Sequence, residues 1–212
     1  MKIVLIDDHA VVREGYRALI SRQADMEVVA EYADANSAYA AFRCLATDVI
    51  VTDLSMPGLS AIEMIERLRQ RGHAASILVF SMHTAVSFAK NAFAAGANGY
   101  VTKSSEPNAL LHGLREVFAG RQYLSADIAQ QLALEQLAPS EQILDTLTVR
   151  EFEILRLLID GRDVENIALS LNLSPKTVRN VHYNIKKKLE VKDDIELMRR
   201  AIQLKIVNAL DI

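Results

Sequence analysis

The sequence contains a single cysteine in 212 residues, which excludes an intrachain disulfide. Cys44 lies in a segment predicted to be helical, residues 39–45, where we expect a buried free thiol. No apolar run approaches the roughly 20 residues needed to cross a bilayer. The first apolar run, residues 3–6, is also too short for a signal peptide and is followed at once by acids. These absences favour a cytoplasmic protein without a membrane-spanning segment.

The sequence also lacks an overall excess of positive charge. It has 24 basic and 27 acidic residues and a formal net charge of −3. Any nucleic-acid site must therefore be a local patch on an otherwise acidic chain. Half of the residues are hydrophobic and 24% are charged, as in ordinary globular proteins, and the length leaves room for two modest domains. The chain has neither internal repeats nor low-complexity tracts.

The first part of the chain alternates short apolar runs with amphipathic segments. The runs span residues 3–6, 27–30, 49–51, 77–80 and 100–101. Between two of them, Ile62, Ile65 and Leu68 recur at helical spacing, with charged residues on the opposite side. Strands that alternate with helices predict a five-stranded parallel sheet in a doubly wound α/β domain.

The pattern becomes entirely helical beyond this region. Ser125 is expected to cap a linker helix over residues 126–137, which Pro139-Ser140 would end. Four further helices are predicted. They begin at Thr148, Asp163, Pro175 and Asp193 or Asp194. We therefore predict three parts, residues 1–120, 121–144 and 145–212.

Polar side chains stand at the carboxyl end of four predicted strands. They are Asp7 and Asp8 after the first, Asp53 after the third, Ser81 at the end of the fourth, and Thr102 and Lys103 after the fifth. Each alone has an ordinary explanation, such as helix capping by Asp8 or a turn at Asp53. Because parallel strands place these ends on one rim, we expect the side chains to form one ligand site.

Three crowded carboxylates predict a counter-cation. Mg²⁺ fits best, because it takes a few carboxylate oxygens and keeps several waters. A carboxylate beside Mg²⁺ can attack a phosphoryl group and form an acyl phosphate. We expect Lys103 to pair with the phosphoryl oxygens and the Ser81 hydroxyl to donate a hydrogen bond to them.

The motifs of this first region resemble the receiver domain of response regulators. They are Asp7-Asp8-His9, residues 52–58, Ser81-Met82-His83, residues 95–100 and Thr102-Lys103. The resemblance covers about residues 1–120 and implies a flavodoxin-like fold with Asp53 as the phosphoacceptor. It assigns the Mg²⁺ site to Asp7, Asp8, Asp53 and the backbone carbonyl of Ser55. It further implies that Ser81 and Tyr100 form the switch and that Lys103 pairs with the phosphate.

One position departs from that family pattern. Many receivers have proline after the lysine, often in a cis peptide bond, whereas this chain has Ser104. A cis bond before a residue other than proline costs about 3 kcal/mol. Either the loop follows a trans path or the site stores strain.

The third predicted helix of the C-terminal part carries a local excess of positive charge. Residues 174–192 contain six cations and one anion, whereas residues 145–212 are nearly balanced, with twelve basic and eleven acidic residues. Val178, Val181, Ile185 and Leu189 recur at steps of three and four and should face the core. The outward face is then available for DNA. It carries Lys176, Thr177, Arg179, Asn180, Tyr183, Lys186 and Lys187.

This helical region resembles the LuxR-type helix-turn-helix. The resemblance rests on residues 147–155, Ile167-Ala168, residues 173–178 and residues 188–191, and covers about residues 144–207. With the receiver it implies the NarL/FixJ class: transcription regulators, not enzymes, that a histidine kinase or a small phosphodonor activates and that bind DNA as homodimers. RNA polymerase is a further candidate partner. By position, Arg179, Asn180 and Tyr183 should meet the major groove. The resemblance suggests residues 193–203 as one dimer surface and helices of the receiver as another.

At some positions this chain departs from the LuxR-type pattern, so the DNA contacts of the family cannot be carried over to those residues. Val181 stands where the family usually has histidine, and Glu165-Asn166 replaces the usual Lys-Glu pair. We therefore assign no DNA contact to those positions from the resemblance.

Two alternative functions stay open at this point. A phosphatase of the haloacid dehalogenase type also uses a strand-end aspartate with Mg²⁺, but it needs a second acid two residues later, where this chain has Ser55. A regulator could instead keep the receiver fold and respond to another ligand or protein partner without phosphorylation. Phosphoryl transfer to Asp53 distinguishes these alternatives.

Overall fold

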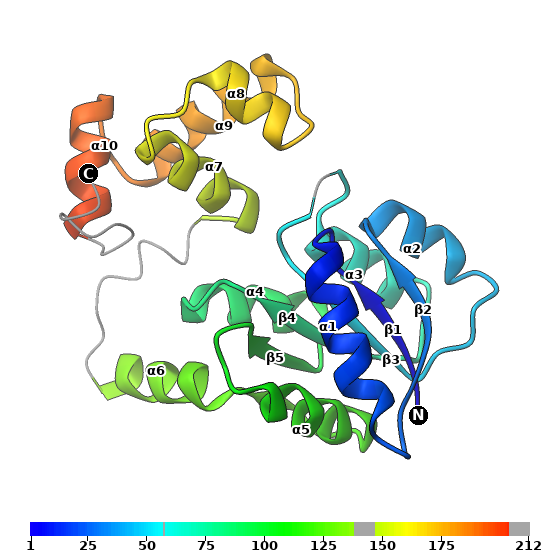
Figure 1. The fold of residues 1–212 in the computed structure, drawn as a ribbon. Coiled ribbons are helices and arrows are strands. Elements are labelled where there is room, and N and C mark those ends of the chain that lie inside the picture. Colours follow the sequence, from blue (N-terminus) through cyan, green and yellow to red (C-terminus); the bar gives the residue numbers. More distant parts are fainter. Residues whose placement is uncertain (57, 138–146, 204–212) are drawn as a thin grey trace. The chain divides into compact units, whose positions relative to one another are not determined.

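The computed structural model describes residues 1–56, 58–137 and 147–203, and these divide into two compact units (Figure 1). The first unit spans Met1–Ala138 and the second Pro139–Ile212. Residue 57, the predicted helix end at Pro139-Ser140 and the far C-terminus lie outside the described residues. The two units are treated separately below.

The first unit is built on a parallel sheet with strand order β2-β1-β3-β4-β5-β6. The strands are β1 (Lys2–Ile6), β2 (Glu27–Tyr32), β3 (Val49–Thr52), β4 (Ser76–Ser81), β5 (Gly99–Thr102) and β6 (Tyr123–Leu124). The predicted doubly wound parallel sheet is confirmed, but the predicted number of five strands is wrong. The sixth strand has only two residues, Tyr123 and Leu124, too few to show the hydrophobic pattern of a strand.

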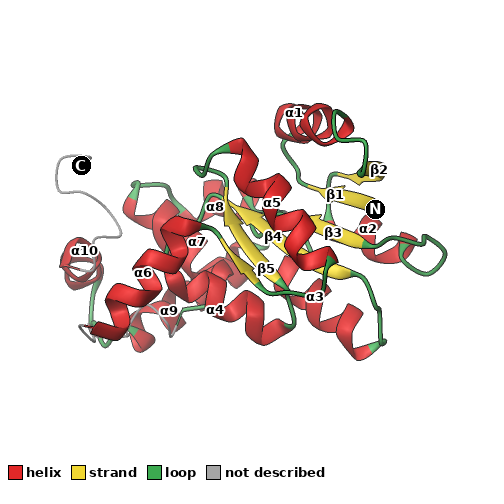
Figure 2. Cartoon of the chain, turned by 90° about the horizontal axis from the view of Figure 1, so that it is seen from below, coloured by secondary structure: helices red, strands yellow, loops and turns green. Residues whose placement is uncertain are grey.

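Helices cover both faces of this sheet (Figure 2). They are α1 (Ala10–Ser21), α2 (Ala35–Ala41), α3 (Ala61–Gln70), α4 (Val86–Ala95), α5 (Pro107–Phe118) and α6 (Ala126–Leu137). On one face, Ile20 of α1 and Leu110 and Leu114 of α5 pack against strand residues in one core cluster. On the other face, α3 and α4 bury Met64, Ile65 and Phe88. Strands β3 and β5 are buried along their whole length, as expected for parallel strands covered on both sides.

The predicted environment of Cys44 is wrong. Helix α2 ends at Ala41, and Cys44 lies in the turn after it with an exposed thiol. Phe42 is the last buried residue before the chain turns towards β3, so Cys44 has no core to enter.

The predicted linker helix is confirmed over Ala126–Leu137 and belongs to the first unit. Ile128 on α6 is fully buried, and the Glu135 carboxylate pairs with Lys90 Nζ of α4 at 3.0 Å. The preceding strand β6 runs parallel to β5, pairing Tyr123 with Gly99 and Leu124 with Tyr100. The segment after α5 therefore extends the sheet before it forms a helix.

The second unit consists of four helices in its described part, as predicted. They are α7 (Val149–Ile159), α8 (Val164–Ser170), α9 (Pro175–Lys188) and α10 (Asp194–Gln203). The side chains of Thr148, Asp163 and Ser174 cap the first three by accepting backbone N–H bonds. Their apolar faces share one core cluster that includes Ile154, Ile167, Val178, Ile185 and Leu197. In the described part of the chain, no helix is both long and apolar enough to span a bilayer.

Glu151 ties two helices of this unit together and yields a first prediction. Its carboxylate accepts hydrogen bonds from Thr148 N at 2.8 Å and from Lys188 Nζ of α9 at 2.6 Å. Burial alone would raise the pKa of Glu151, but these hydrogen bonds outweigh it and hold the pKa below the usual 4.5. Stability from this carboxylate is therefore present above the unfolded-state pKa and is lost as the pH falls through the folded-state pKa.

The substitution Glu151→Gln is expected to lower the free energy of unfolding of the second unit by about 1 kcal/mol at pH 7. The loss should shrink as the pH falls below 4.5 and through the folded-state pKa of Glu151, because the wild-type carboxylate is then protonated and, like the amide of glutamine, carries no charge. Hydrogen exchange of α7 and α9 amides in the full chain measures both values. The exposed Glu190→Gln serves as the control. If Glu151→Gln lowered the free energy of unfolding equally at both pH values, the negative charge of Glu151 would not be the source of the stabilisation.

Candidate functional site

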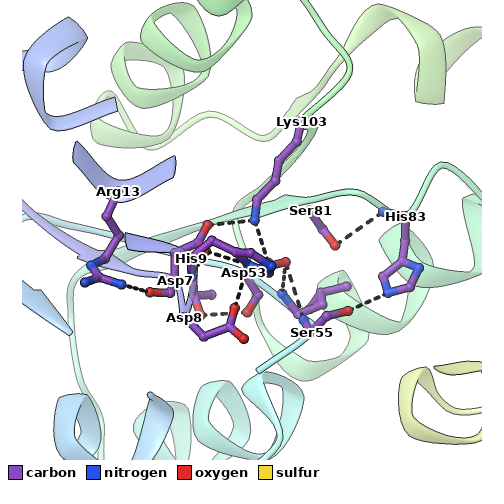
Figure 3. Close-up of polar contacts among 11 residues, drawn as sticks. Asp7, Asp8, His9, Arg13, Asp53, Ser55, Ser81, His83 and Lys103 are labelled. Carbon is purple, nitrogen blue, oxygen red and sulfur yellow. Dashed lines mark hydrogen bonds and ion pairs between the residues drawn. The ribbon is translucent and has the colours of Figure 1, made fainter. Parts of the chain in front are cut away.

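Three aspartates gather at the carboxyl ends of β1 and β3 (Figure 3). Asp7 and Asp8 directly follow β1, and Asp53 directly follows β3. Together with His9, each offers one ligand atom, and these atoms lie within 4.8 Å of one another. The parallel register explains the meeting, because Ile6 pairs with Thr52 and the two strands end side by side.

Lys103 reaches this cluster from the end of β5. Its Nζ lies 2.5 Å from Asp53 Oδ2 and 2.6 Å from Asp7 Oδ2, and its side chain is 6% exposed. Burial disfavours the ammonium, but the charges and hydrogen bonds of Asp53 and Asp7 outweigh it, so the pKa of Lys103 is raised. One buried cation thus bridges two buried carboxylates.

The acids still carry more negative charge than Lys103 neutralises. The pKa of Asp8 is raised above its usual value, and burial is the largest cause. The charge of His9 opposes this rise, whereas the charges of Asp53 and Asp7 add to it. Among the described residues, the atoms that could bind a metal ion here are carboxylate oxygens of Asp7, Asp8 and Asp53 and one imidazole nitrogen of His9. This donor set suits a hard divalent cation such as Mg²⁺.

The Asp53 side chain is also held by the backbone amides of the two residues that follow it. Its Oδ1 accepts hydrogen bonds from Leu54 N at 2.6 Å and Ser55 N at 3.4 Å. Its Oδ2 faces Lys103. The carboxylate is therefore oriented on both sides, with 3% of its residue surface exposed.

The predicted switch residues lie on the neighbouring strands. Ser81 is fully buried at the end of β4, and its Oγ accepts a hydrogen bond from His83 N at 3.4 Å. Tyr100 of β5 is also fully buried, and its hydroxyl donates to the backbone carbonyl of His83 at 2.8 Å. Burial holds the pKa of Tyr100 well above its usual value. Both predicted switch side chains are thus hydrogen-bonded to the backbone of the same residue, His83.

The Lys103–Ser104 peptide bond is trans, as are the other peptide bonds in the part of the chain that the structure describes. The loop therefore follows the first of the two paths that the Ser104 departure left open.

Three side chains near the acids were not assigned a role from the sequence. Arg13 of α1 donates from its guanidinium to the backbone carbonyl of Asp7. The Ser55 hydroxyl lies 2.7 Å from His83 Nε2 (Figure 3). The His83 ring also stacks on Phe88. His83 stands only two residues after Ser81, so its place on the rim could have been inferred. No sequence pattern indicated its bond to Ser55.

Helix α9 carries the predicted basic face in the second unit. Val178 and Ile185 are fully buried and Val181 is half-buried. The predicted DNA-facing set is mostly exposed. Lys176, Thr177, Arg179, Asn180, Tyr183 and Lys187 are exposed, and Lys186 is half-buried.

Several members of this set have partners within the unit. Arg179 Nη2 lies 2.7 Å from Glu165 Oε1 of α8, with both side chains about 60% exposed. Lys186 Nζ lies 3.0 Å from Asp194 Oδ1 of α10. The Thr177 hydroxyl lies 2.8 Å from the capping Ser174 hydroxyl. The face is therefore basic, but acids on α8 and α10 border it.

Comparison with known families matches both units. Residues 3–115 match the family described as "Response regulator receiver domain". Residues 145–201 match the family described as "Bacterial regulatory proteins, luxR family".

The chain is similar along nearly its whole length to curated response regulators. It is 34% identical to the response regulator UvrY of Escherichia coli K12 over 211 residues, which cover 99% of this chain and 97% of that protein. It is 36% identical to the transcriptional regulatory protein UhpA of the same strain, covering 93% and 96% of the two chains. It is 32% identical to the response regulator GacA of Pseudomonas aeruginosa, covering 99% of each.

Solved structures give the same result. A LuxR-family two-component response regulator from Aurantimonas is 49% identical and covers 64% of this chain and 97% of its own, with a TM-score of 0.62. Salmonella enterica RcsB bound to a promoter is 27% identical and covers 94% and 97% of the two chains, with a TM-score of 0.67. With its acidic receiver site and its basic helix-turn-helix, this chain belongs to the response regulators of the NarL/FixJ class, which are DNA-binding regulators of transcription.

Proposed function

We propose that Asp53 accepts a phosphoryl group from a sensor histidine kinase or a small phosphodonor, and that phosphorylation controls DNA binding. The observation that carries this proposal is the position of the Asp53 carboxylate, fixed by Leu54 N and Lys103 and crowded by Asp7 and Asp8. A nucleophile needs this kind of fixed orientation, and a transferred phosphoryl group needs nearby positive charge.

The chemistry follows from the residues around Asp53. A carboxylate oxygen of Asp53 forms a bond to phosphorus, and the bond from phosphorus to the donor breaks, with its electron pair leaving on the donor. Lys103 pairs with the oxygens of the transferred group, and the Ser81 hydroxyl donates a hydrogen bond to them. Asp7, Asp8, Asp53 and the Ser55 carbonyl would hold Mg²⁺, which when bound stabilises the negative charge of the phosphoryl group.

We further propose that α9 enters the major groove. Arg179 and Asn180 are exposed and suit bidentate contacts with guanine and adenine edges, whereas Lys176, Thr177, Tyr183, Lys186 and Lys187 suit phosphate contacts. Phosphorylation would favour a homodimer that places two copies of α9 on two half-sites, with α10 as one dimer surface. We infer that the protein acts in the cytoplasm with a kinase partner, and RNA polymerase is a further candidate partner.

The deciding experiment treats the full chain with acetyl phosphate and Mg²⁺ and maps the product by mass spectrometry. One phosphoryl group on the Asp53 peptide, together with tighter binding to a DNA site selected from a random library, is the expected result. Unchanged DNA binding without any phosphoryl group on Asp53 would favour a regulator that works without phosphorylation.

Two substitutions on α9 are expected to separate base reading from phosphate contact. Arg179→Ala should weaken binding to the selected site about tenfold and relax the preference at one base position. Lys187→Ala should weaken binding to all sequences alike and reduce the slope of log affinity against log salt by about one. Fluorescence anisotropy with matched and mismatched duplexes at several salt concentrations measures both effects. Identical behaviour of the two variants would contradict the assignment.

A further inference from the structure

The loop after Lys103 is held by hydroxyl groups instead of a proline ring. The Thr102 hydroxyl lies 3.1 Å from the Ser104 hydroxyl and 2.8 Å from the Ser105 hydroxyl. Ser105 N also donates to the backbone carbonyl of Thr102 at 3.1 Å. Thr102 is fully buried, so its hydroxyl must be satisfied inside the protein.

The acceptor for this hydroxyl cluster comes from the linker helix. Asp127, in the first turn of α6, accepts hydrogen bonds from Thr102 Oγ1 at 2.6 Å and from Ser105 Oγ at 3.2 Å. Burial would raise the pKa of Asp127, but hydrogen bonds from Ser125, Thr102 and Ser105 outweigh it and lower the pKa. The carboxylate is therefore a strong acceptor that spans both ends of the turn.

Strand β6 fixes the position of Asp127 beside this loop. Ser125 N donates to the Tyr100 carbonyl at 2.9 Å, and Thr102 N donates to the Ser125 hydroxyl at 3.4 Å. Beyond the last paired residues of β6 and β5, these two hydrogen bonds hold Ser125 beside Thr102. The first turn of α6 therefore begins next to the loop.

This arrangement fixes the backbone position of Lys103, from which its side chain extends towards the acids. On one side, Lys103 N donates to the Ser81 carbonyl at 2.7 Å. On the other side, Asp127 holds Thr102 and Ser105, the residues that flank the Lys103-Ser104 pair. A lysine side chain has four flexible methylene groups, so its ammonium reaches Asp53 and Asp7 reliably only from a fixed backbone.

We propose that Asp127 is a positioning residue for Lys103, so that the linker helix α6 supplies part of the phosphorylation site. The proposal rests on the proposed role of Lys103 towards Asp53. Coupling of this kind is reciprocal, and a phosphoryl group that draws Lys103 also changes the stability of the first turn of α6. The site and the segment that leads to the DNA-binding unit are then linked by one carboxylate.

The test compares Asp127→Ala with Glu135→Ala. Both variants remove one negative charge from α6, but Glu135 lies at the other end of the helix and pairs with Lys90. The first measurement is the NMR signal of the Lys103 ammonium in the unphosphorylated full chain, assigned with Lys103→Met. Its pairing with Asp53 and Asp7 should protect it from exchange with water. We expect Asp127→Ala to speed this exchange at least fivefold and so to abolish the signal. Glu135→Ala should keep the signal, with an exchange rate within twofold of the wild-type rate.

The second measurement is the rate of phosphoryl incorporation from acetyl phosphate with Mg²⁺. Asp127→Ala should lower it about fivefold or more, and Glu135→Ala should change it less than twofold. An unaltered Lys103 signal in Asp127→Ala, or equal effects of the two variants, would overturn the proposal. Failure of the wild type to take up phosphate would refute the proposed function alone, because the ammonium signal is read without phosphorylation.

Discussion

The substitution Asp53→Asn is expected to abolish phosphoryl incorporation, lowering it at least about 100-fold. The amide oxygen is a poor nucleophile, and in the wild type Leu54 N and Ser55 N hold one oxygen of the Asp53 carboxylate while Lys103 Nζ holds the other. Asparagine keeps the size of the side chain and retains an oxygen that can accept from Leu54 N, so the fold should persist. Intact-mass analysis of the full chain after treatment with acetyl phosphate and Mg²⁺ gives the result directly.

Asp25→Asn is the matched control for this experiment. Asp25 lies on the surface of the same unit and pairs with Arg115 Nε at 3.0 Å, away from the cluster. This variant should incorporate phosphate at the wild-type rate. Incorporation by Asp53→Asn at that same rate would show that another residue is the acceptor.

The acidic cluster could be predicted from the sequence because its parts stand at strand ends. Asp7 and Asp53 are 46 positions apart in the sequence, yet a parallel sheet brings the ends of β1 and β3 together whatever the length of the connection. The outward face of α9 could be predicted for a similar reason. Buried Val178 and Ile185 set the rotation of the helix and leave Arg179 and Asn180 outside.

The hydrogen bonds between separate elements could not be predicted in the same way. Ser125 and Asp127 look like the start of an ordinary capped helix, and nothing local indicates that the Asp127 carboxylate faces Thr102. The strand β6 was missed because two residues carry no periodicity, although its pairing places α6 beside the site. The Glu165–Arg179 pair joins two helices whose mutual orientation depends on core packing, so charge patterns along either helix do not predict it.

These missed contacts share a physical origin. A side chain that binds within its own element follows the period of that element, but a contact between elements depends on packing that sequence spacing does not encode. The acids at the strand ends define what chemistry the site can perform. The contacts from Arg13, His83 and Asp127 define how rigidly it is held.

The buried position of Lys103 leads to the largest expected effect on stability. Lys103→Met keeps most of the side-chain volume but removes the only ammonium that the structure places between Asp53 and Asp7 within its described residues. Two buried carboxylates would then repel each other without a counter-charge. Because loss of one partner from a buried ion pair typically costs 3–5 kcal/mol, we expect the free energy of unfolding of the first unit to fall by about 3 kcal/mol without divalent cations.

Addition of Mg²⁺ should raise the free energy of unfolding of Lys103→Met by more than it raises that of the wild type. The variant should thereby recover part of its loss. The acids of the variant lack the repulsion that the lysine exerts on a second cation, so they should bind Mg²⁺ more tightly, and binding to the folded state adds stability by mass action. Urea unfolding with and without Mg²⁺ measures the four values. Lys90→Met, which removes a surface ammonium on α4, should show little change in either condition. A Lys103→Met protein that is as stable as the wild type without Mg²⁺, or that gains nothing when Mg²⁺ is added, would show that repulsion among these acids does not govern the site.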